Sequence, residues 1–172
     1  KNDLFRCEND IFRVLDSKQD GVFIINCTRQ TMPQWCDFAS FSDYKVCTEQ
    51  DLLLQSGIVL SDIDMLSPSI KRVIHERYTI VAGVLPFLCD SKLRNAAISR
   101  IAENKGICKQ TIRNYLCLYL AYQDITVLAK TNGTASFSIA IDEHGKPTDY
   151  TYQWFVNGSL VFGAVDAHYT LS

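Results

Sequence analysis

The sequence predicts an α+β fold in three parts: a small N-terminal β subdomain (residues 1–66), a three-helix bundle with a helix-turn-helix (67–130) and a C-terminal β-meander (131–172). Short β-prone runs bounded by turn residues occupy both ends of the chain, whereas apolar residues recur at helical spacing in the middle. The charge divides in the same way. Residues 67–130 are basic, with 10 Lys or Arg against 4 Asp or Glu. The flanking parts are acidic: residues 1–66 hold 6 Lys or Arg against 11 Asp or Glu, and residues 131–172 hold 1 Lys against 4 Asp or Glu.

The N-terminal part contains a predicted β-hairpin. Residues 11–15 and 22–26 are rich in β-branched and aromatic side chains. The polar stretch between them, residues 16–21, ends in Asp-Gly, which favours a hairpin turn.

The rest of the N-terminal part has weaker patterns. We expect residues 28–48 to be irregular, with Trp35 as an anchor of the core. Residues 49–60 suggest a short helix or turn followed by a strand, and the acidic residues 61–64 suggest a linker.

The middle part carries start and stop signals for helices. Ser67 precedes a proline, which is tolerated in the first turn of a helix, and Pro86 ends or kinks that helix. Asp90 or Ser91 can cap a second helix, which extends to about Lys105.

The second and third helices form the predicted helix-turn-helix. Ala102 is small enough for the two helices to cross closely, and Gly106 ends the second helix where a left-handed backbone is needed. The third helix begins at Cys108 or Lys109 and runs to about Tyr122. A thiol at the cap position makes a weak cap, so this helix start is expected to be weakened.

Hydrogen-bonding side chains gather at the outer, N-terminal end of the third helix. They are Lys109, Gln110, Thr111, Arg113 and Asn114. Helix-turn-helix proteins place this end in the DNA major groove, where Lys109 or Arg113 can pair with guanine and Gln110 or Asn114 with adenine. Candidate phosphate contacts are Arg94, Arg100 and Lys105. An ordinary solvated helix surface is the favoured interpretation of Arg94 and Arg100.

The C-terminal part has β character. Residues 135–141 and 150–156 are β-prone, residues 143–147 suggest a turn, and Asn157-Gly158 favours a tight hairpin. We expect three or four strands in a meander, which needs a packing partner because a sheet this small is marginal alone.

The residues that could carry other chemistry are scattered. Seven cysteines form no C-x-x-C pair and the N-terminus has no signal-peptide pattern, so we expect reduced thiols in a cytoplasmic protein. The three histidines lack ligand spacing, and we expect no metal or other cofactor and no small-molecule ligand. No run of about 18 apolar residues predicts a membrane span. The carboxylates at positions 62, 64, 142, 143 and 149 fall in expected linkers or turns and do not suggest a catalytic site.

Residues 4–129 resemble the N-terminal region of TnsB-type and Mu-type DDE transposases. Three segments carry the resemblance in order: DIFRVLDSKQDGVFIIN, KRVIHERYTIV and LRNAAISRIAENKGICKQTIRNYLCLYLAYQDITVLA. Tyr119, Tyr122 and residues 127–129 stand where the family has an aromatic-rich helix end and a closing Ala-Leu segment. The family's Arg-Tyr-Trp at the end of the third helix is replaced here by residues 118–120. The tail, residues 131–172, is faintly similar to half of an immunoglobulin-like module.

The resemblance implies binding to double-stranded DNA at the terminal repeats of a mobile element, alongside other transposase subunits. In that family, cleavage and strand transfer in transposition, DNA recombination and integration belong to a later RNase H-like domain. No counterpart of that domain is present in these residues, so we expect DNA binding without enzymatic activity.

Two other functions fit the same pattern. A helix-turn-helix transcriptional regulator would need a dimer interface and often an effector pocket, and the sequence displays no heptad seam and no clear sensor. A protein-interaction module would use the three helices for packing alone, which the Leu- and Tyr-rich third helix allows.

Overall fold

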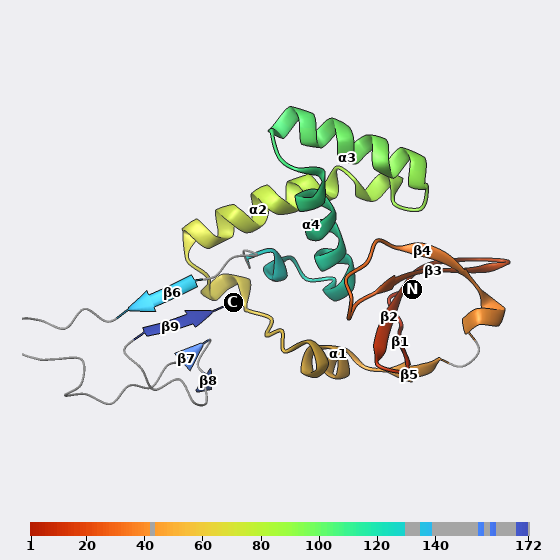
Figure 1. The fold of residues 1–172 in the computed structure, drawn as a ribbon, viewed down its shortest axis with the longest axis horizontal. Coiled ribbons are helices and arrows are strands. Elements are labelled where there is room, and N and C mark those ends of the chain that lie inside the picture. The colour runs from red at the N-terminus through yellow and green to blue at the C-terminus, as the bar shows by residue number, and fades with distance from the viewer. Residues whose placement is uncertain (42–43, 130–134, 139–154, 157–158, 161–167, 172) are drawn as a thin grey trace, which may run out of the picture. The chain divides into compact units, whose positions relative to one another are not determined.

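The computed structural model describes residues 1–41, 44–129, 135–138, 155–156, 159–160 and 168–171. The chain divides into two compact units, residues 1–130 and residues 131–172. The first unit combines a five-stranded antiparallel sheet with four α-helices, and the predicted α+β class is therefore confirmed (Figure 1).

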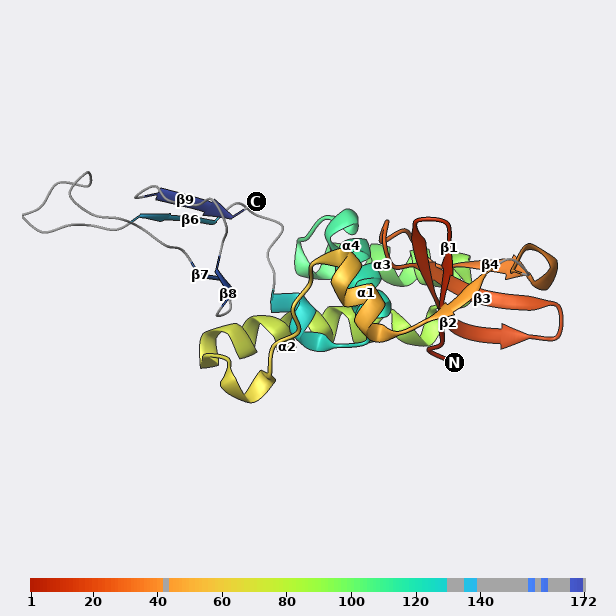
Figure 2. The same cartoon turned by 90° about the horizontal axis from the view of Figure 1, so that it is seen from below.

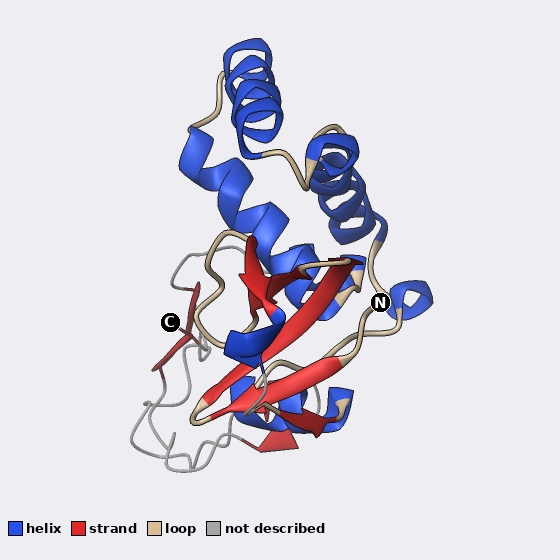
Figure 3. Ribbon diagram, turned by 90° about the vertical axis from the view of Figure 1, so that its right-hand side faces the viewer, coloured by secondary structure: helices blue, strands red, loops and turns tan. Residues whose placement is uncertain are grey.

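The sheet of the first unit is built around the predicted hairpin. Its strands, drawn in red in Figure 3, are β1 (Leu4–Cys7), β2 (Asp10–Lys18), β3 (Gly21–Asn26), β4 (Gln34–Asp37) and β5 (Lys45–Cys47). They pair in the order β4-β3-β2-β1-β5. The hairpin turn is shorter than expected because β2 and β3 extend up to it. Gly21 is required by packing, since a Cβ there would lie 2.5 Å from the carbonyl oxygen of Cys36 on β4.

The expectation of irregular chain over residues 28–48 was wrong, because β4 and β5 lie within it. Both are short edge strands: β4 pairs with β3, the preceding strand, whereas β5 pairs with the distant β1, where Leu4 lies opposite Cys47. Three or four residues are too few to display a strand period. Trp35 lies on edge strand β4 and is 36% exposed, so it does not anchor the core. Its ring packs against Phe23 instead, with 5.2 Å between ring centroids.

The α-helices are α1 (Glu49–Ser56), α2 (Pro68–Ala82), α3 (Ser91–Lys105) and α4 (Lys109–Tyr122). Short 3₁₀ turns lie at η1 (Phe38–Phe41), η2 (Ile63–Met65), η3 (Leu85–Phe87) and η4 (Ile125–Ala129). Side chains cap the starts of α1, α2 and α3: Thr48 in a reciprocal pair with Asp51, then Ser67, then Asp90. The strand expected after α1 is not found, as the described residues 58–62 are not part of any strand.

The larger of two buried clusters joins the sheet to the helices. Leu4, Ile11 and Ile25 from the strands are buried in the same cluster as Ile98 and Leu116 from α3 and α4. Figure 1 shows α4 running from α3 toward the strands, and Figure 2 shows the same helices and strands from below. The predicted boundary at residues 66 and 67 therefore cuts through this cluster, because strand and helix side chains from both sides of it are buried together.

Arg13 on β2 connects the sheet to two helices. Its side chain is 0% exposed, and Nε donates a hydrogen bond to the carbonyl oxygen of Ala121, near the end of α4, at 2.8 Å. Its two terminal nitrogens donate to the Glu49 carboxylate in the first turn of α1, at 2.6 and 2.8 Å. A cation at a helix C-terminus and an anion at a helix N-terminus both complement the helix dipole. The positive charge of Arg13 is therefore balanced by the Glu49 carboxylate and by the partial negative charge of the Ala121 carbonyl.

The second unit contains β6 (Ala135–Ser138), β7 (Phe155–Val156), β8 (Ser159–Leu160) and β9 (His168–Leu171). β7 pairs with β8, whereas β6 pairs antiparallel with β9 from the far end of the unit. Among the described residues, the strands are therefore not paired in the expected meander. Alternation indicates a strand but does not determine which partner it pairs with. Residues 139–154, the Asn157-Gly158 turn and residues 161–162 lie outside the described residues.

Within the described part of the chain, no helix is long and apolar enough to cross a membrane.

Replacing Arg13 with Met is expected to lower the free energy of unfolding by about 2–4 kcal/mol, because the buried Ala121 carbonyl loses its strong donor and keeps only the weak thiol donor of Cys27. Glu49→Gln should cost less, since the Glu49 side chain is 59% exposed and water can replace it in part. Urea unfolding monitored by circular dichroism measures both. Arg29→Met, which removes a surface ion pair with Asp10, is the control and should change little. Equal effects of Arg13→Met and Arg29→Met would contradict the role of Arg13.

The stability should fall in alkaline solution because of Cys27. Burial raises the pKa of this thiol from 9.0 to about 12. The unfolded chain releases this proton above its ordinary pKa, whereas the native state keeps it until the raised pKa. The contribution of Cys27 is therefore fully present below pH 9.0 and is lost as the pH rises toward 12, by up to about 1.4 kcal/mol per pH unit. Urea unfolding at several alkaline pH values should show a shallower slope for Cys27→Ala than for the unmodified chain.

Candidate nucleic-acid interface

Helices α3 and α4 are joined by three residues, 106–108. Gly106 ends α3 with a φ of +65°, and its N–H donates to the carbonyl oxygen of Ala102, as predicted for this position. A Cβ at Gly106 would meet no atom within 4 Å, so the backbone angle alone requires glycine there. Ala102 is buried, as its expected place at a close helix crossing requires.

The start of α4 has no side-chain cap. Cys108 occupies the N-cap position with an extended backbone, and its thiol makes no capping hydrogen bond. This confirms the expected weak cap. The N–H groups of the first turn of a helix lack partners within the helix and carry a partial positive charge. Because Cys108, Lys109 and Gln110 are exposed, this end of α4 is open to an anion from outside the chain.

The five hydrogen-bonding residues predicted at the outer end of the third helix all lie on the first half of α4. Lys109, Gln110 and Asn114 are exposed, while Thr111 and Arg113 are partly buried. The Gln110 side-chain amide donates to the Asn114 side-chain oxygen at 2.9 Å, one helical turn away. The opposite side of the helix is held in the core by Ile112 and Leu116, both 0% exposed. The exposed side chains therefore project from a fixed helix.

Cations dominate the two helices. α3 and α4 together contain six Lys or Arg and one carboxylate, that of Glu103. Arg100 and Lys105 are exposed on α3, as a phosphate contact requires. In the part of the chain that the structure describes, neither of them, nor Lys109 or Arg113, has a carboxylate oxygen within salt-bridge distance. Their charges remain available to a partner.

Arg94 is the predicted site residue that the structure removes from the surface. It is 7% exposed, and its guanidinium donates to the carbonyl oxygen of Leu88 at 2.7 Å. Burial lowers the pKa of Arg94, since the charged form is the one that loses hydration. Both expectations for Arg94, the solvated helix surface that was favoured and the phosphate contact, were therefore wrong. A helical position alone does not tell whether a long cationic side chain points outward or folds into the core.

Sequence reasoning also passed over two exposed cations, Arg72 on α2 and Lys92 on α3. Their positions in the basic part of the chain were the only sequence feature that could have marked them as candidate phosphate contacts. Not every cation in this part is free: Arg77 donates to the carbonyl oxygen of Leu128 at 2.6 Å and lies over the Tyr115 ring at 5.1 Å.

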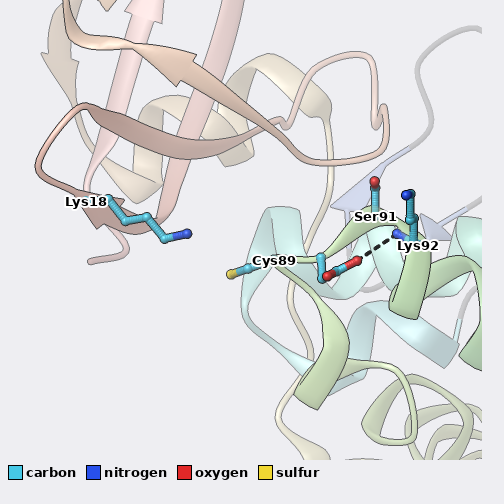
Figure 4. Close-up of a pocket in the computed structure, with 5 residues that line it drawn as sticks. Lys18, Cys89, Ser91 and Lys92 are labelled. Carbon is cyan, nitrogen blue, oxygen red and sulfur yellow. Dashed lines mark hydrogen bonds between the residues drawn. The ribbon is translucent and has the colours of Figure 1, made fainter.

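A hollow at the start of α3 also has cationic side chains, from Lys18 and Lys92 (Figure 4). Asp90 occupies the helix start itself, where its carboxylate accepts from the N–H groups of Lys92 and Leu93 at 2.8 and 3.0 Å. The chain thus supplies its own anion at α3. The start of α4 has no such group.

The described residues contain no group of three His, Cys, Asp or Glu side chains that could hold a metal ion. Two of the five carboxylates considered above are described. Asp62 accepts from the N–H of Asp64 and so caps the η2 turn, as a turn acid would. The carboxylates at 142, 143 and 149 lie outside the described residues.

No family model and no curated protein matches the chain.

Replacing Cys108 with Ser should stabilise the first unit by about 1 kcal/mol, because a hydroxyl can accept from the open N–H groups that the thiol leaves without a partner. Thermal unfolding measures the effect. Cys108→Ala is the matched control, since it removes the thiol without supplying an acceptor, and it should produce no gain. An equal shift in both variants would show that capping is not the cause.

Proposed function

We propose that this protein binds double-stranded DNA sequence-specifically, with α3 and α4 acting as a helix-turn-helix and the first half of α4 as the recognition element. The observation that carries the proposal is the uncapped start of α4 together with the exposed Lys109, Gln110 and Asn114 beside it. Major-groove recognition requires exposed hydrogen-bonding side chains near the start of a helix whose other side is packed in the core, as Ile112 and Leu116 pack here.

Base recognition in this proposal falls to four side chains. Lys109 and Arg113 donate to the O6 and N7 acceptors of guanine, and Gln110 and Asn114 match the acceptor and donor of adenine. The Gln110–Asn114 hydrogen bond leaves the Asn114 amide nitrogen and the Gln110 carbonyl oxygen free for a base. Each good contact is worth about 1–3 kcal/mol of discrimination.

Phosphate contacts in this proposal come from both helices. Arg100 and Lys105 are exposed cations on α3, and the open N–H groups at the start of α4 add a site for one phosphate oxygen. Each neutralised phosphate releases counterions, so the logarithm of the affinity should fall linearly with the logarithm of salt concentration, by about 0.9 per contact.

The resemblance to TnsB-type and Mu-type transposases makes the terminal repeats of a mobile element the first target to test. The corresponding role is DNA recognition during transposition, with cleavage left to a separate catalytic domain. The resembling segments include both the hairpin β2–β3 and the α3–α4 pair.

The test uses two sets of DNA duplexes. One set is selected from a random pool by binding to the full chain, and the other carries terminal repeats of mobile elements. In fluorescence anisotropy, Lys109→Ala and Arg113→Ala should each weaken binding to the selected duplex by about 5- to 150-fold, the equivalent of 1–3 kcal/mol. Lys45→Ala is the control, because it removes an exposed cation on β5, away from α4.

Arg100→Ala should instead weaken binding to all duplexes alike and reduce the salt slope by about one. Unchanged affinity in the two α4 variants, with unchanged thermal unfolding, would disprove this function. Binding of a palindromic site by a stable dimer would favour a transcriptional regulator instead.

A further inference from the structure

The segment between α1 and the η2 turn has the side-chain pattern of a strand but no partner strand among the described residues. Ile58 and Leu60 pack against the core, whereas Val59 between them is 55% exposed. This alternation is that of a half-buried strand, and β-branched residues such as Ile58 and Val59 favour one. In Figure 1 the segment runs as a loop from α1 toward α2.

The main chain of this segment is unpaired. Within the described part of the chain, the N–H groups and carbonyl oxygens of Val59, Leu60 and Ser61 form no hydrogen bond with any protein group. On one side, the N–H of Ile58 donates to the Ser56 hydroxyl at 3.3 Å, and on the other side the η2 turn begins. Main-chain groups are almost never buried without a partner, so these groups face solvent. A row of unpaired main-chain groups is a template on which another strand can add.

Large apolar side chains are exposed along the same part of the chain. Leu54 at the end of α1 is 75% exposed, Val59 is 55% exposed and Met65 in the η2 turn is 84% exposed. Exposed apolar side chains that follow one another in this way mark surfaces for other proteins more often than isolated ones do. An added strand would cover Val59 with an apolar side chain of its own, as cross-strand pairs do.

The charge around the segment determines which partner fits. Residues 50–66 contain three carboxylates and no Lys or Arg. Asp62 and Asp64 are exposed, and neither carboxylate has a cation within salt-bridge distance in the described residues. Lys71 lies nearby, but its amine donates to the backbone carbonyl oxygen of Asp64 at 3.1 Å. DNA and a second copy of this chain would each bring negative charge to these carboxylates, whereas a cationic segment would be attracted.

We propose that residues 59–61 accept an extended, cationic segment of a partner protein as an added β-strand. Main-chain hydrogen bonds to Val59, Leu60 and Ser61 hold the segment, an apolar side chain covers Val59, and Lys or Arg side chains lie beside Asp62 and Asp64. Strand addition of this kind takes its affinity from the main chain and its specificity from alternate side chains. The surface does not depend on the proposed DNA contacts, because it uses no residue of α3 or α4.

The test uses the full chain in two-dimensional NMR without DNA. The probe is an eight-residue peptide of alternating Lys and Val. Two matched peptides serve as controls: one has Glu in place of Lys, and the other has the Lys–Val sequence with every backbone nitrogen methylated, which removes its donors. We expect saturable shifts of the backbone amides of Val59, Leu60 and Ser61, and their protection from hydrogen exchange, with the first peptide. Both controls should bind at least about tenfold more weakly.

A pair of substitutions tests the charge. Asp62→Asn together with Asp64→Asn should weaken binding of the Lys–Val peptide by about 2- to 30-fold, the range for two exposed ion pairs. Thermal unfolding should be unchanged, because Asn can also cap the η2 turn. Asp20→Asn is the control, since it removes an exposed carboxylate from the β2–β3 turn, and it should leave the affinity unchanged.

Three results would overturn the proposal. The first is the absence of saturable shifts at residues 59–61, and the second is equal binding of either control peptide or unchanged affinity in the double variant. The third is a set of shifts at residues 59–61 that depend on protein concentration without peptide, together with a dimer in sedimentation. That result would identify a second copy of the chain as the occupant.

Discussion

The organisation of the first unit depends on one buried cation. Arg13 lies on β2, and it ties the last turn of α4 to the first turn of α1 through the Ala121 carbonyl and the Glu49 carboxylate. An isolated buried charge is costly, and this one is offset because every group that it contacts carries full or partial negative charge. The same side chain therefore joins both helices to the sheet.

Anchoring one end of α4 gives the helix two different halves. Its last turns contribute Leu116, Leu120 and Ala121 to the core shared with the strands, whereas Lys109 and Gln110 at its start are exposed. This explains why the sequence becomes so apolar after Asn114. That apolar stretch is the segment that packs the helix against the sheet. A helix held this firmly at one end is a suitable support for contacts made at the other.

Local signals predicted the parts of the fold that depend on a few adjacent residues. Gly106 was recognisable because a left-handed helix end needs glycine, and Asp90 because a carboxylate can accept from the N–H groups of the first turn. The β2–β3 hairpin followed from two β-prone runs on either side of a polar turn. Each of these features is complete within about 15 residues, and tertiary packing did not override them.

The sequence by itself thus determined the α+β class, the ends of α3 and α4, and the five hydrogen-bonding residues at the start of α4. Only the tertiary structure decided that sheet and helices share one core, that Arg94 turns inward, and that β5 completes the sheet beside β1. The physical reason is the range of the interactions. Caps, turns and helix periods are set by neighbours in the chain, whereas strand partners and the burial of Arg13 or Arg94 depend on groups brought together from distant segments.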